Sequence, residues 1–354
     1  MMNSSELNVV NVTNPVNAAT GWKGTAVLLI GFGGPESLAE VEPFLRSVLA
    51  GRSIPESRLA MIAERYRSVG GISPFCGEAR RFAERLATLL GDCGVPIPVF
   101  TSFLHASPKP AELARQLHHT GYRRVFVQIL TPTDGYESRD RYVKSLGVVM
   151  NGSPLCTEGH PIDIGDAINW QLLPTLCENR GFVETASRQI INRLTELSPG
   201  SLAGEWKILF TAHSVPLSMP GIERYQDQVN ETARRIVGQL PWKNEYHVAW
   251  QSRSGRSVEP WLTPTPVDMV LQHTSEHAST AKWLVVPIGF LLENLELTFD
   301  LDRELAATVT TAPNGVYKRL PAIGGEPGLV RLIARSVLKE LTPVNENYAD
   351  TFAS

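Results

Sequence analysis

Cysteine is scarce in this sequence of 354 residues. None of its four cysteines forms a C-x-x-C pair, and they lie at Cys76, Cys93, Cys156 and Cys177. This spacing indicates neither a zinc knuckle nor a disulfide framework. We therefore expect ordinary buried thiols in the reducing cytoplasm.

Long apolar runs are also absent. The longest ones, such as Ala26–Ile30 and Trp283–Ile288, fall well short of the roughly 20 residues that span a bilayer. We expect no transmembrane segment. Residues 1–22 are polar and rich in Asn, and they lack the basic region and apolar core of a secretory signal. That stretch is expected to be a flexible leader.

Charge of one sign is not in excess either. The chain carries 33 Lys and Arg against 36 Asp and Glu, which gives a formal net charge of -3. A basic face that would gather nucleic-acid phosphates or anionic lipids is therefore not expected. We expect a monomer that binds no nucleic acid.

The sequence does contain a regular alternation of two patterns. With 43% hydrophobic residues it can bury two cores of ordinary size. Apolar runs typical of buried strands recur at residues 25–32, 97–104, 123–130, 207–212, 245–250 and 283–290. Helical patterns lie at residues 38–50, 57–68, 75–91, 109–119, 182–197, 222–239, 296–308 and 326–341. This alternation predicts an α/β fold of parallel sheets covered by helices on both faces.

A break in the alternation predicts a domain boundary. Turn residues are dense between Arg139 and Pro161. We place a first α/β unit at 23–150 and a second at 160–325. A closing helix at 326–341 could pack on either unit, and a tail follows at 342–354. Because the two units share the same element order, they are candidates for a diverged duplication.

Ligands of doubly wound folds collect at the carboxyl ends of strands, so candidate site residues are sought there. The first strand runs into a Gly-rich turn, Gly31–Glu36. This is not a dinucleotide fingerprint, because Glu36 stands where G-x-G-x-x-G needs its last glycine. Two interpretations are open: a tight strand-to-helix turn, or a close approach of the backbone to a flat ligand beside Phe32.

A basic segment, Arg65–Pro74, also allows two interpretations. Arg65, Arg67 and Ser73 could hold carboxylates, since guanidinium forks suit that geometry. Alternatively, a helix ends at Gly70 and its basic residues complement the helix dipole.

A histidine follows a buried strand in the segment Phe210–Pro216. A lone histidine is more often structural than chemical, but the carboxyl end of a strand favours a catalytic role for His213. Two tryptophans flank polar residues in Trp250–Gly255 and Pro260–Pro264. They could form the floor for an aromatic ligand or cap the core.

Three acidic residues are spaced four apart in the segment Pro287–Glu304. On a helix, Glu296, Asp300 and Glu304 would form one line along a single face. Like charges at this spacing repel by about a few tenths of a kcal/mol per pair. Either a cation visits this line, or it is a solvated acidic face.

Together these segments resemble the ferrochelatases, and within them the coproporphyrin ferrochelatases of many bacteria. The resemblance extends over nearly all of residues 25–341, and its most specific pieces are Phe210–Pro216, Ala249–Gly255 with Pro260–Pro264, and Pro287–Asp302. It implies two similar Rossmann-like halves with a porphyrin cleft between them. It also implies an enzyme of haem biosynthesis that inserts Fe²⁺ into a porphyrin.

The resemblance implies roles for individual residues as well. His213 and Glu296 match the family's facing catalytic pair at the metal site. Asp300 and Glu304 match an acidic track that conducts metal or protons. Contacts with the porphyrin or its propionates are implied for Phe32, Arg65, Tyr66, Ser73 and Tyr142.

The chemistry of metal insertion suits these residue types. A porphyrin must lose two pyrrole protons as Fe²⁺ enters, and a neutral imidazole is a suitable acceptor near physiological pH. A carboxylate opposite can take the protons onward or steer the cation. Porphyrin and ferrous iron are thus the expected partners, both as substrates, and no permanently bound cofactor is expected.

Some positions depart from the family pattern. Asn294 and Thr133 stand where many relatives have histidine, and Phe32 stands where several coproporphyrin enzymes have tyrosine. These changes reduce the number of available metal ligands. No cysteine-rich tail follows residue 342, so the iron–sulfur cluster of some relatives is not expected.

Two other functions stay open. One is a chelatase for another metal or tetrapyrrole, since His and carboxylate ligands do not decide the metal. The other is a porphyrin carrier that kept the cleft and lost turnover. For the substrate, Gly70–Ser73 and Trp250–Gly255 favour coproporphyrin III over protoporphyrin IX.

Overall fold

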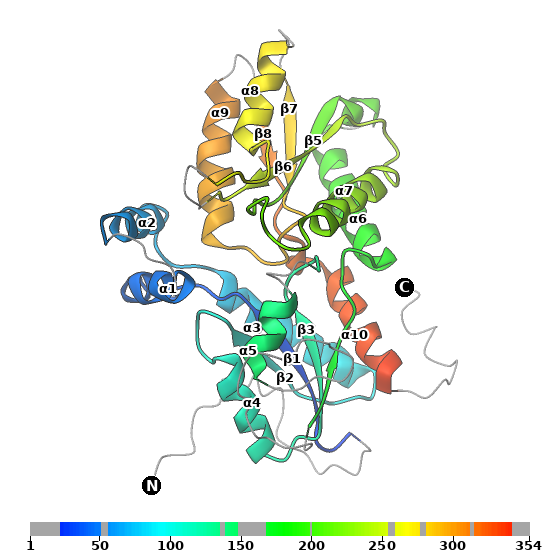
Figure 1. The fold of residues 1–354 in the computed structure, drawn as a ribbon. Coiled ribbons are helices and arrows are strands. Elements are labelled where there is room, and N and C mark those ends of the chain that lie inside the picture. The colour runs from blue at the N-terminus through cyan, green and yellow to red at the C-terminus, as the bar shows by residue number, and fades with distance from the viewer. Residues whose placement is uncertain are drawn as a thin grey trace.

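The computed structural model describes residues 22–50, 56–134, 139–147, 168–198, 200–253, 259–276, 281–311 and 315–341. Along the chain these residues form two α/β halves, each built on a four-stranded parallel sheet. In Figure 1 the first half is the lower one and the second half the upper one. The expected leader at 1–22, apart from Trp22, and the tail at 342–354 lie outside the described residues.

The first sheet has the strand order β2-β1-β3-β4. Its strands are β1 (Thr25–Gly31), β2 (Val99–Phe103), β3 (Arg124–Ile129) and β4 (Asn169–Leu172). Every residue of β1 is buried, because helices cover both faces of this central strand. The helices of the first half are η1 (Leu38–Glu40), α1 (Val41–Val48), α2 (Glu56–Ser68), α3 (Phe75–Asp92), α4 (Pro110–His119) and α5 (Arg141–Leu146).

Successive residues of β1 belong to two different cores. Val27 and Leu29 pack in the core that includes α3, whereas Leu28 and Ile30 pack in the core that includes α4 and α5. A strand sends alternate side chains to opposite faces, so a continuous apolar run fills both cores. Helices α1 and α2 instead project to the left in Figure 1, with a small apolar cluster of their own.

The second sheet has the strand order β6-β5-β7-β8. Its strands are β5 (Trp206–His213), β6 (Tyr246–Gln251), β7 (Lys282–Val286) and β8 (Val316–Arg319). The helical elements of this half are α6 (Arg180–Leu197), η4 (Gly200–Glu205), α7 (Ile222–Val237), α8 (Pro266–Glu276), the π-helix η5 (Leu297–Leu305), α9 (Ala306–Thr311), η6 (Ile323–Gly325) and α10 (Pro327–Leu341).

The two sheets repeat the same strand order, so the expected similarity of the halves is confirmed. β1 pairs with β2 on one side and with β3 on the other, and β5 pairs in the same way with β6 and β7. β1 and β5 therefore occupy equivalent central positions. In this topology the switch point lies at the carboxyl end of the central strand, where ligands bind. Phe32 follows β1 directly and His213 is the last residue of β5.

The boundary between the halves lies further along the chain than expected. β4 pairs with β3, so residues 169–172 belong to the first half and not to a second unit that begins at 160. This strand has only four residues and one fully buried side chain. A strand that short does not produce the apolar run by which its neighbours were predicted.

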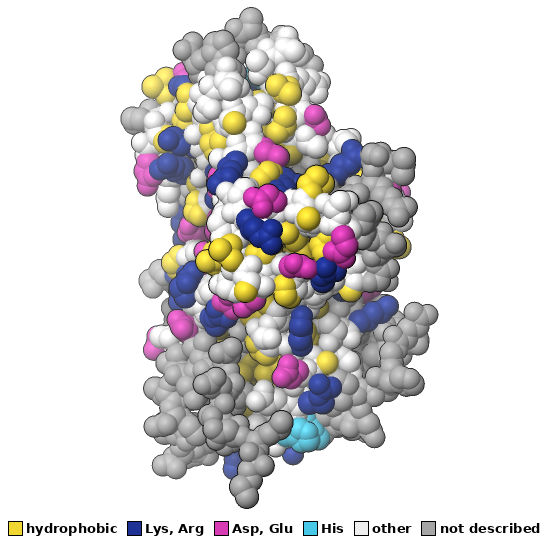
Figure 2. All heavy atoms as spheres, turned by 90° about the vertical axis from the view of Figure 1, so that its left-hand side faces the viewer, with side chains coloured by type: hydrophobic (Ala, Val, Ile, Leu, Met, Phe, Trp, Pro, Cys, Tyr) yellow, Lys and Arg dark blue, Asp and Glu magenta, His cyan; other side chains and the backbone are white. Residues whose placement is uncertain are grey.

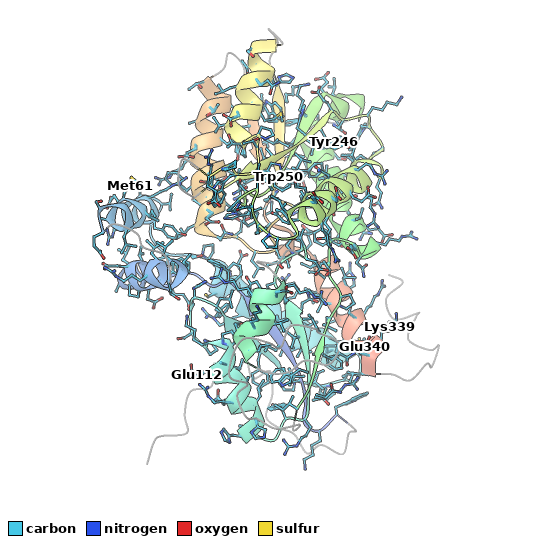
Figure 3. The ribbon with its side chains drawn as sticks, in the orientation of Figure 1. Met61, Glu112, Tyr246, Trp250, Lys339 and Glu340 are labelled. Carbon is cyan, nitrogen blue, oxygen red and sulfur yellow. The ribbon has the colours of Figure 1, made fainter. Side chains whose placement is uncertain are left out.

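Helix α10 closes the molecule by contacting both halves. It packs on α3 of the first half and on α6 of the second, and one hydrophobic core includes residues from all three helices. Figure 3 shows Lys339 and Glu340 at its end, beside the first half. There Arg124 of β3 donates to the backbone carbonyl of Glu340 at 2.8 Å.

The described surface and helices agree with the charge pattern of the sequence. Figure 2 shows the face on the α1 and α2 side, where acidic and basic side chains are interspersed with apolar ones. On this face no charge of one sign dominates. Among the described helices, none combines the length and the apolar character that a membrane span requires.

Candidate active site

His213 is oriented by the backbone around the end of β5. Its Nδ1 lies within hydrogen-bond distance of the carbonyl oxygen of Ser214. Because a carbonyl can only accept, Nδ1 carries the proton and Nε2 of the neutral ring keeps its lone pair. Nε2 is 3.6 Å from Oε2 of Glu296. The carbonyl of His213 itself accepts from the Tyr225 hydroxyl at 2.8 Å, which fixes the strand end.

A glycine allows Glu296 to approach this histidine. Gly289 follows β7 and donates to the carbonyl of Thr211 on β5 at 3.0 Å. A Cβ at this position would lie 2.6 Å from Cα of Ala212, so no larger residue fits without a shift. The close passage carries the chain past the end of β5, and the helix with Glu296 begins six residues later.

Asn294 caps that helix. Its Oδ1 accepts from the backbone N–H of Leu297 at 2.9 Å, in the usual geometry of an N-cap. Asn294 stands where many members of the resembled family have histidine. In this chain the residue has a structural task.

The acidic line is present, but its helix is not the expected α-helix. Residues Leu297–Leu305 form a π-helix, a rare form with i→i+5 hydrogen bonds that is often found at functional sites. The side chain of Asp300 is 11% exposed and that of Glu304 is 51% exposed. Because the side chain of Glu296 is 37% exposed, Asp300 is the most enclosed member of the line and Glu304 the most exposed.

Burial raises the pKa of all three carboxyls of the acidic line. Although 37% of its side-chain area is accessible, protein atoms surround Glu296, and loss of hydration raises the pKa of its carboxyl above the usual range. The charge of Asp300 raises the pKa of Glu296 further. Desolvation likewise raises the pKa of Asp300 and of Glu304, against the lowering effect of Arg65.

Asp300 contacts a side chain from each half of the molecule, Arg65 of the first and Ser252 of the second. Nη2 of Arg65, on α2, lies 2.5 Å from Asp300 Oδ1 and 3.5 Å from Glu304 Oε2, and its guanidinium stacks 3.8 Å from the ring centroid of Phe299. Arg65 was expected to hold carboxylates, and the ones it binds here belong to the chain itself.

Ser252 lies in the segment Trp250–Gly255, but it was not itself predicted to be a site residue. Its hydroxyl donates to Oδ2 of Asp300. Its φ of 64° is the only positive value among the described residues other than glycine, and such a conformation often marks a functional position. The available signal was its place, because Ser252 follows β6 at the carboxyl edge of the sheet.

Tyr66 and Phe32 also lie on this side of the first half. Burial first, and then the charges of Glu296 and Asp300, raise the pKa of the Tyr66 hydroxyl, which places it near both carboxylates. The rings of Tyr66 and Phe32 lie 6.0 and 6.1 Å from the ring of Phe44 between them. Of the sequence-predicted residues, the structure thus brings Tyr66 to the acidic line and Phe32 to the same aromatic cluster.

Two residues that were predicted to contact the porphyrin, Ser73 and Tyr142, are buried. Ser73 is 5% exposed, and its hydroxyl accepts from the N–H of Phe75 at the start of α3. Tyr142 is 3% exposed and packs in the core of α4 and α5. In this arrangement neither hydroxyl is available at the surface that His213 and Glu296 share.

The other segments singled out by sequence are explained by packing. Trp250, in the middle of the second half in Figure 3, is 3% exposed and lies against Tyr225, so it belongs to the core. A Cβ on Gly34 would meet Ser73 at 2.5 Å, so the Gly-rich turn permits close packing within the chain. Gly70, with φ 96°, ends α2 as the helix-terminus interpretation predicts.

The donor set at the site is small. His213 and Glu296 supply one imidazole nitrogen and one carboxylate at facing positions. Within the ranges that the structure describes, no group of three or more His, Cys, Asp or Glu side chains is arranged to hold a metal ion.

The family model for ferrochelatase matches residues 24–341. The chain belongs to the ferrochelatase family. Ferrochelatases insert a metal ion into a porphyrin in haem biosynthesis, so this chain is an enzyme and a lyase of that kind. In this member of the family, His213 and Glu296 face each other at the switch point of the second sheet.

Similar proteins support the family assignment. The coproporphyrin III ferrochelatase of Mycobacteroides abscessus is 34% identical over 283 residues, which cover 79% of this chain and 78% of that protein. The ferrochelatase of Rhodopirellula baltica is 28% identical over 334 residues, covering 91% and 88%. SirB from Bacillus subtilis, solved with Fe³⁺, superimposes with a TM-score of 0.53 at 13% identity, covering 89% of this chain and 94% of SirB. That structure shows a shared chelatase fold.

Proposed function

We propose that this ferrochelatase inserts Fe²⁺ into coproporphyrin III and that His213 and Glu296 form the insertion site. The observation that carries the proposal is the approach of His213 Nε2 to Glu296 Oε2, at 3.6 Å, with Asp300 and Glu304 continuing from Glu296 towards solvent. The relative of Mycobacteroides abscessus, named for coproporphyrin III, supports the choice of porphyrin.

The two side chains can remove both pyrrole protons. Nε2 of His213 has a free lone pair and accepts one proton when iron enters the ring. The raised pKa of the Glu296 carboxyl makes it a better base than an exposed glutamate, so it can accept the second. Asp300 and Glu304 lie along the route by which protons leave, or by which hydrated Fe²⁺ arrives.

The porphyrin is proposed to lie between the halves, in contact with Phe32, Arg65 and Tyr66. Arg65 reaches across from α2 to Asp300, so a propionate would replace Asp300 as partner of the guanidinium fork. Coproporphyrin III carries two more propionates than protoporphyrin IX, and each needs a cationic or hydrogen-bonding partner. The roles of Ser73 and Tyr142 require a rearrangement that exposes their hydroxyls, and they stay predictions.

Iron is a substrate in this proposal, and no resident cofactor is proposed. Purified protein should show no absorbance from an iron–sulfur cluster and no bound sulfide. An equimolar content of inorganic sulfide would contradict this expectation.

An anaerobic insertion assay tests the proposed function. Coproporphyrin III and protoporphyrin IX are supplied separately at equal concentrations with Fe²⁺, and with Co²⁺ or Ni²⁺ in parallel. The proposal predicts a larger kcat/KM for coproporphyrin III and Fe²⁺ than for any other pairing. Faster reaction with protoporphyrin IX or with another metal would correct the substrate. Tight porphyrin binding without insertion of any metal would indicate a carrier.

A further inference from the structure

One arginine binds two acidic residues that lie close in sequence to Glu296 and Asp300. Arg319 is the last residue of β8, the edge strand of the second sheet. Its Nε and Nη2 donate to the two carboxylate oxygens of Asp302 at 2.7 and 2.8 Å. Its Nη1 donates to Oε1 of Glu293 at 2.8 Å and to the carbonyl of Leu320 at 3.1 Å.

The two carboxylates bracket the proposed insertion residues in sequence. Glu293 precedes Glu296 by three positions, and Asp302 follows Asp300 by two. One guanidinium therefore binds the segment before the helix and the π-helix η5 itself. A fork with donors on two edges can do this, whereas a lysine ammonium offers a single point charge.

Glu293 also forms hydrogen bonds with two residues other than Arg319. Its Oε1 accepts from the backbone N–H of Ala322 at 2.7 Å, and its own N–H donates to Oε2 of Glu78 at 3.0 Å. Glu78 lies on α3, in the first half. The segment that leads into the helix is thus tied both to the second sheet and to the opposite half of the molecule.

The contacts of Arg319 with Glu293 and Asp302 are partly shielded from solvent. The side chain of Arg319 is 14% exposed and that of Glu293 is 18% exposed, while Asp302 keeps 36%. Removal of the guanidinium would leave two carboxylates close together in a partly desolvated place, where they repel. The π-helix would then be free to relax to α-helical geometry, which changes the angle between successive acidic side chains.

We propose that Arg319 is a positioning residue for metal insertion: by binding Glu293 and Asp302 together, it fixes the backbone that carries Glu296 and Asp300. Arg319 touches neither the metal nor the porphyrin in this role. The proposal rests on the proposed function, because it gives a purpose to the placement of Glu296 opposite His213.

The test compares Arg319→Met, Arg319→Lys and Asp302→Asn with wild type in the full chain. Arg303→Met is the matched control, because Arg303 is an exposed arginine of the same π-helix with no ion pair among the described residues. Initial rates are measured anaerobically against Fe²⁺ concentration and, separately, against coproporphyrin III. Thermal midpoints establish that each variant is folded at the assay temperature.

Misplacement by about 1 Å costs on the order of 10²-fold in rate, so Arg319→Met should lower kcat/KM for Fe²⁺ by about 10- to 100-fold. The KM for porphyrin should stay within about two-fold, because the peripheral contacts lie on the first half. Arg319→Lys should recover part of the loss, and Arg303→Met should behave like wild type. Combining Arg319→Met with Asp302→Asn should cost little more than Arg319→Met alone, because both changes break one contact.

Folded variants with wild-type dependence on Fe²⁺ would overturn the role of Arg319, and so would an equal loss against both substrates. If Arg319→Met does not fold, Asp302→Asn decides alone, since it keeps the shape and removes one carboxylate. A wild-type chain that inserts no iron would instead overturn the proposed function, and with it this role.

Discussion

His213 and Glu296 differ in how far the sequence could predict their properties. The position of His213 at a strand end follows from the apolar run before it, which the structure reproduces as β5. The tautomer of His213 does not follow from the sequence, because it depends on the carbonyl of Ser214, whose position is set by local backbone geometry. The raised pKa of Glu296 is also invisible in sequence, since it depends on burial by residues far along the chain.

Glu296→Gln should make the protein more stable at neutral pH. A carboxyl whose pKa is raised in the folded state supports folding below its unfolded pKa, near the ordinary value of 4.5, and loses that support as pH rises through the folded pKa. At pH 7 the buried charge is a cost that glutamine removes. The thermal midpoint should rise by on the order of 1–2 °C, and the difference from wild type should vanish as pH falls below that ordinary value.

Glu84→Gln serves as the control for this measurement. Glu84 is exposed in the middle of α3, beyond the reach of the helix-terminal charges, so the midpoint of this variant should follow wild type throughout. A Glu296→Gln midpoint below that of wild type at pH 7 would show that the charge of Glu296 is stabilised in the folded protein.

The helix that carries the acidic line shows what periodicity can and cannot predict. A spacing of four predicted one acidic face over residues 296–308, and Asp300 and Glu304 do share one partner, Arg65. Its π-helical form was not predictable from that spacing. Distant residues contact this helix, among them Arg65 and Arg319, and the spacing within the helix does not reveal them.

Asn294→Ala should destabilise this helix through loss of its cap. Replacing an N-cap asparagine by alanine costs about 1 kcal/mol in free energy of unfolding. Asn294→Asp should keep nearly full stability, because its carboxylate caps equally well and interacts favourably with the helix dipole. Chemical denaturation of the three proteins checks the order. Equal destabilisation by alanine and aspartate would mean that the loss does not arise from the contact with Leu297.

For the whole molecule, the sequence predicted parallel sheets and a repeated architecture, because the central strands of both halves are continuous apolar runs. It missed β4 and β8, which lie at sheet edges and are short and partly exposed. The boundary was misplaced for the same reason. Of the residues to which the family resemblance assigns roles, the structure brings His213 and Glu296 together and buries Ser73 and Tyr142.

The most direct test of the account is the rate of Fe²⁺ insertion into coproporphyrin III by His213→Ala and Glu296→Gln, with porphyrin binding measured in parallel by fluorescence quenching. The matched control is His247→Ala, which removes another histidine of the second sheet that lies 2.8 Å from a glutamate, Glu245. Loss of a group that accepts protons in the reaction costs about 10²- to 10⁴-fold. The account predicts losses of that size in both site variants with porphyrin affinity retained, and wild-type rates for His247→Ala. Near-normal turnover by His213→Ala would contradict it.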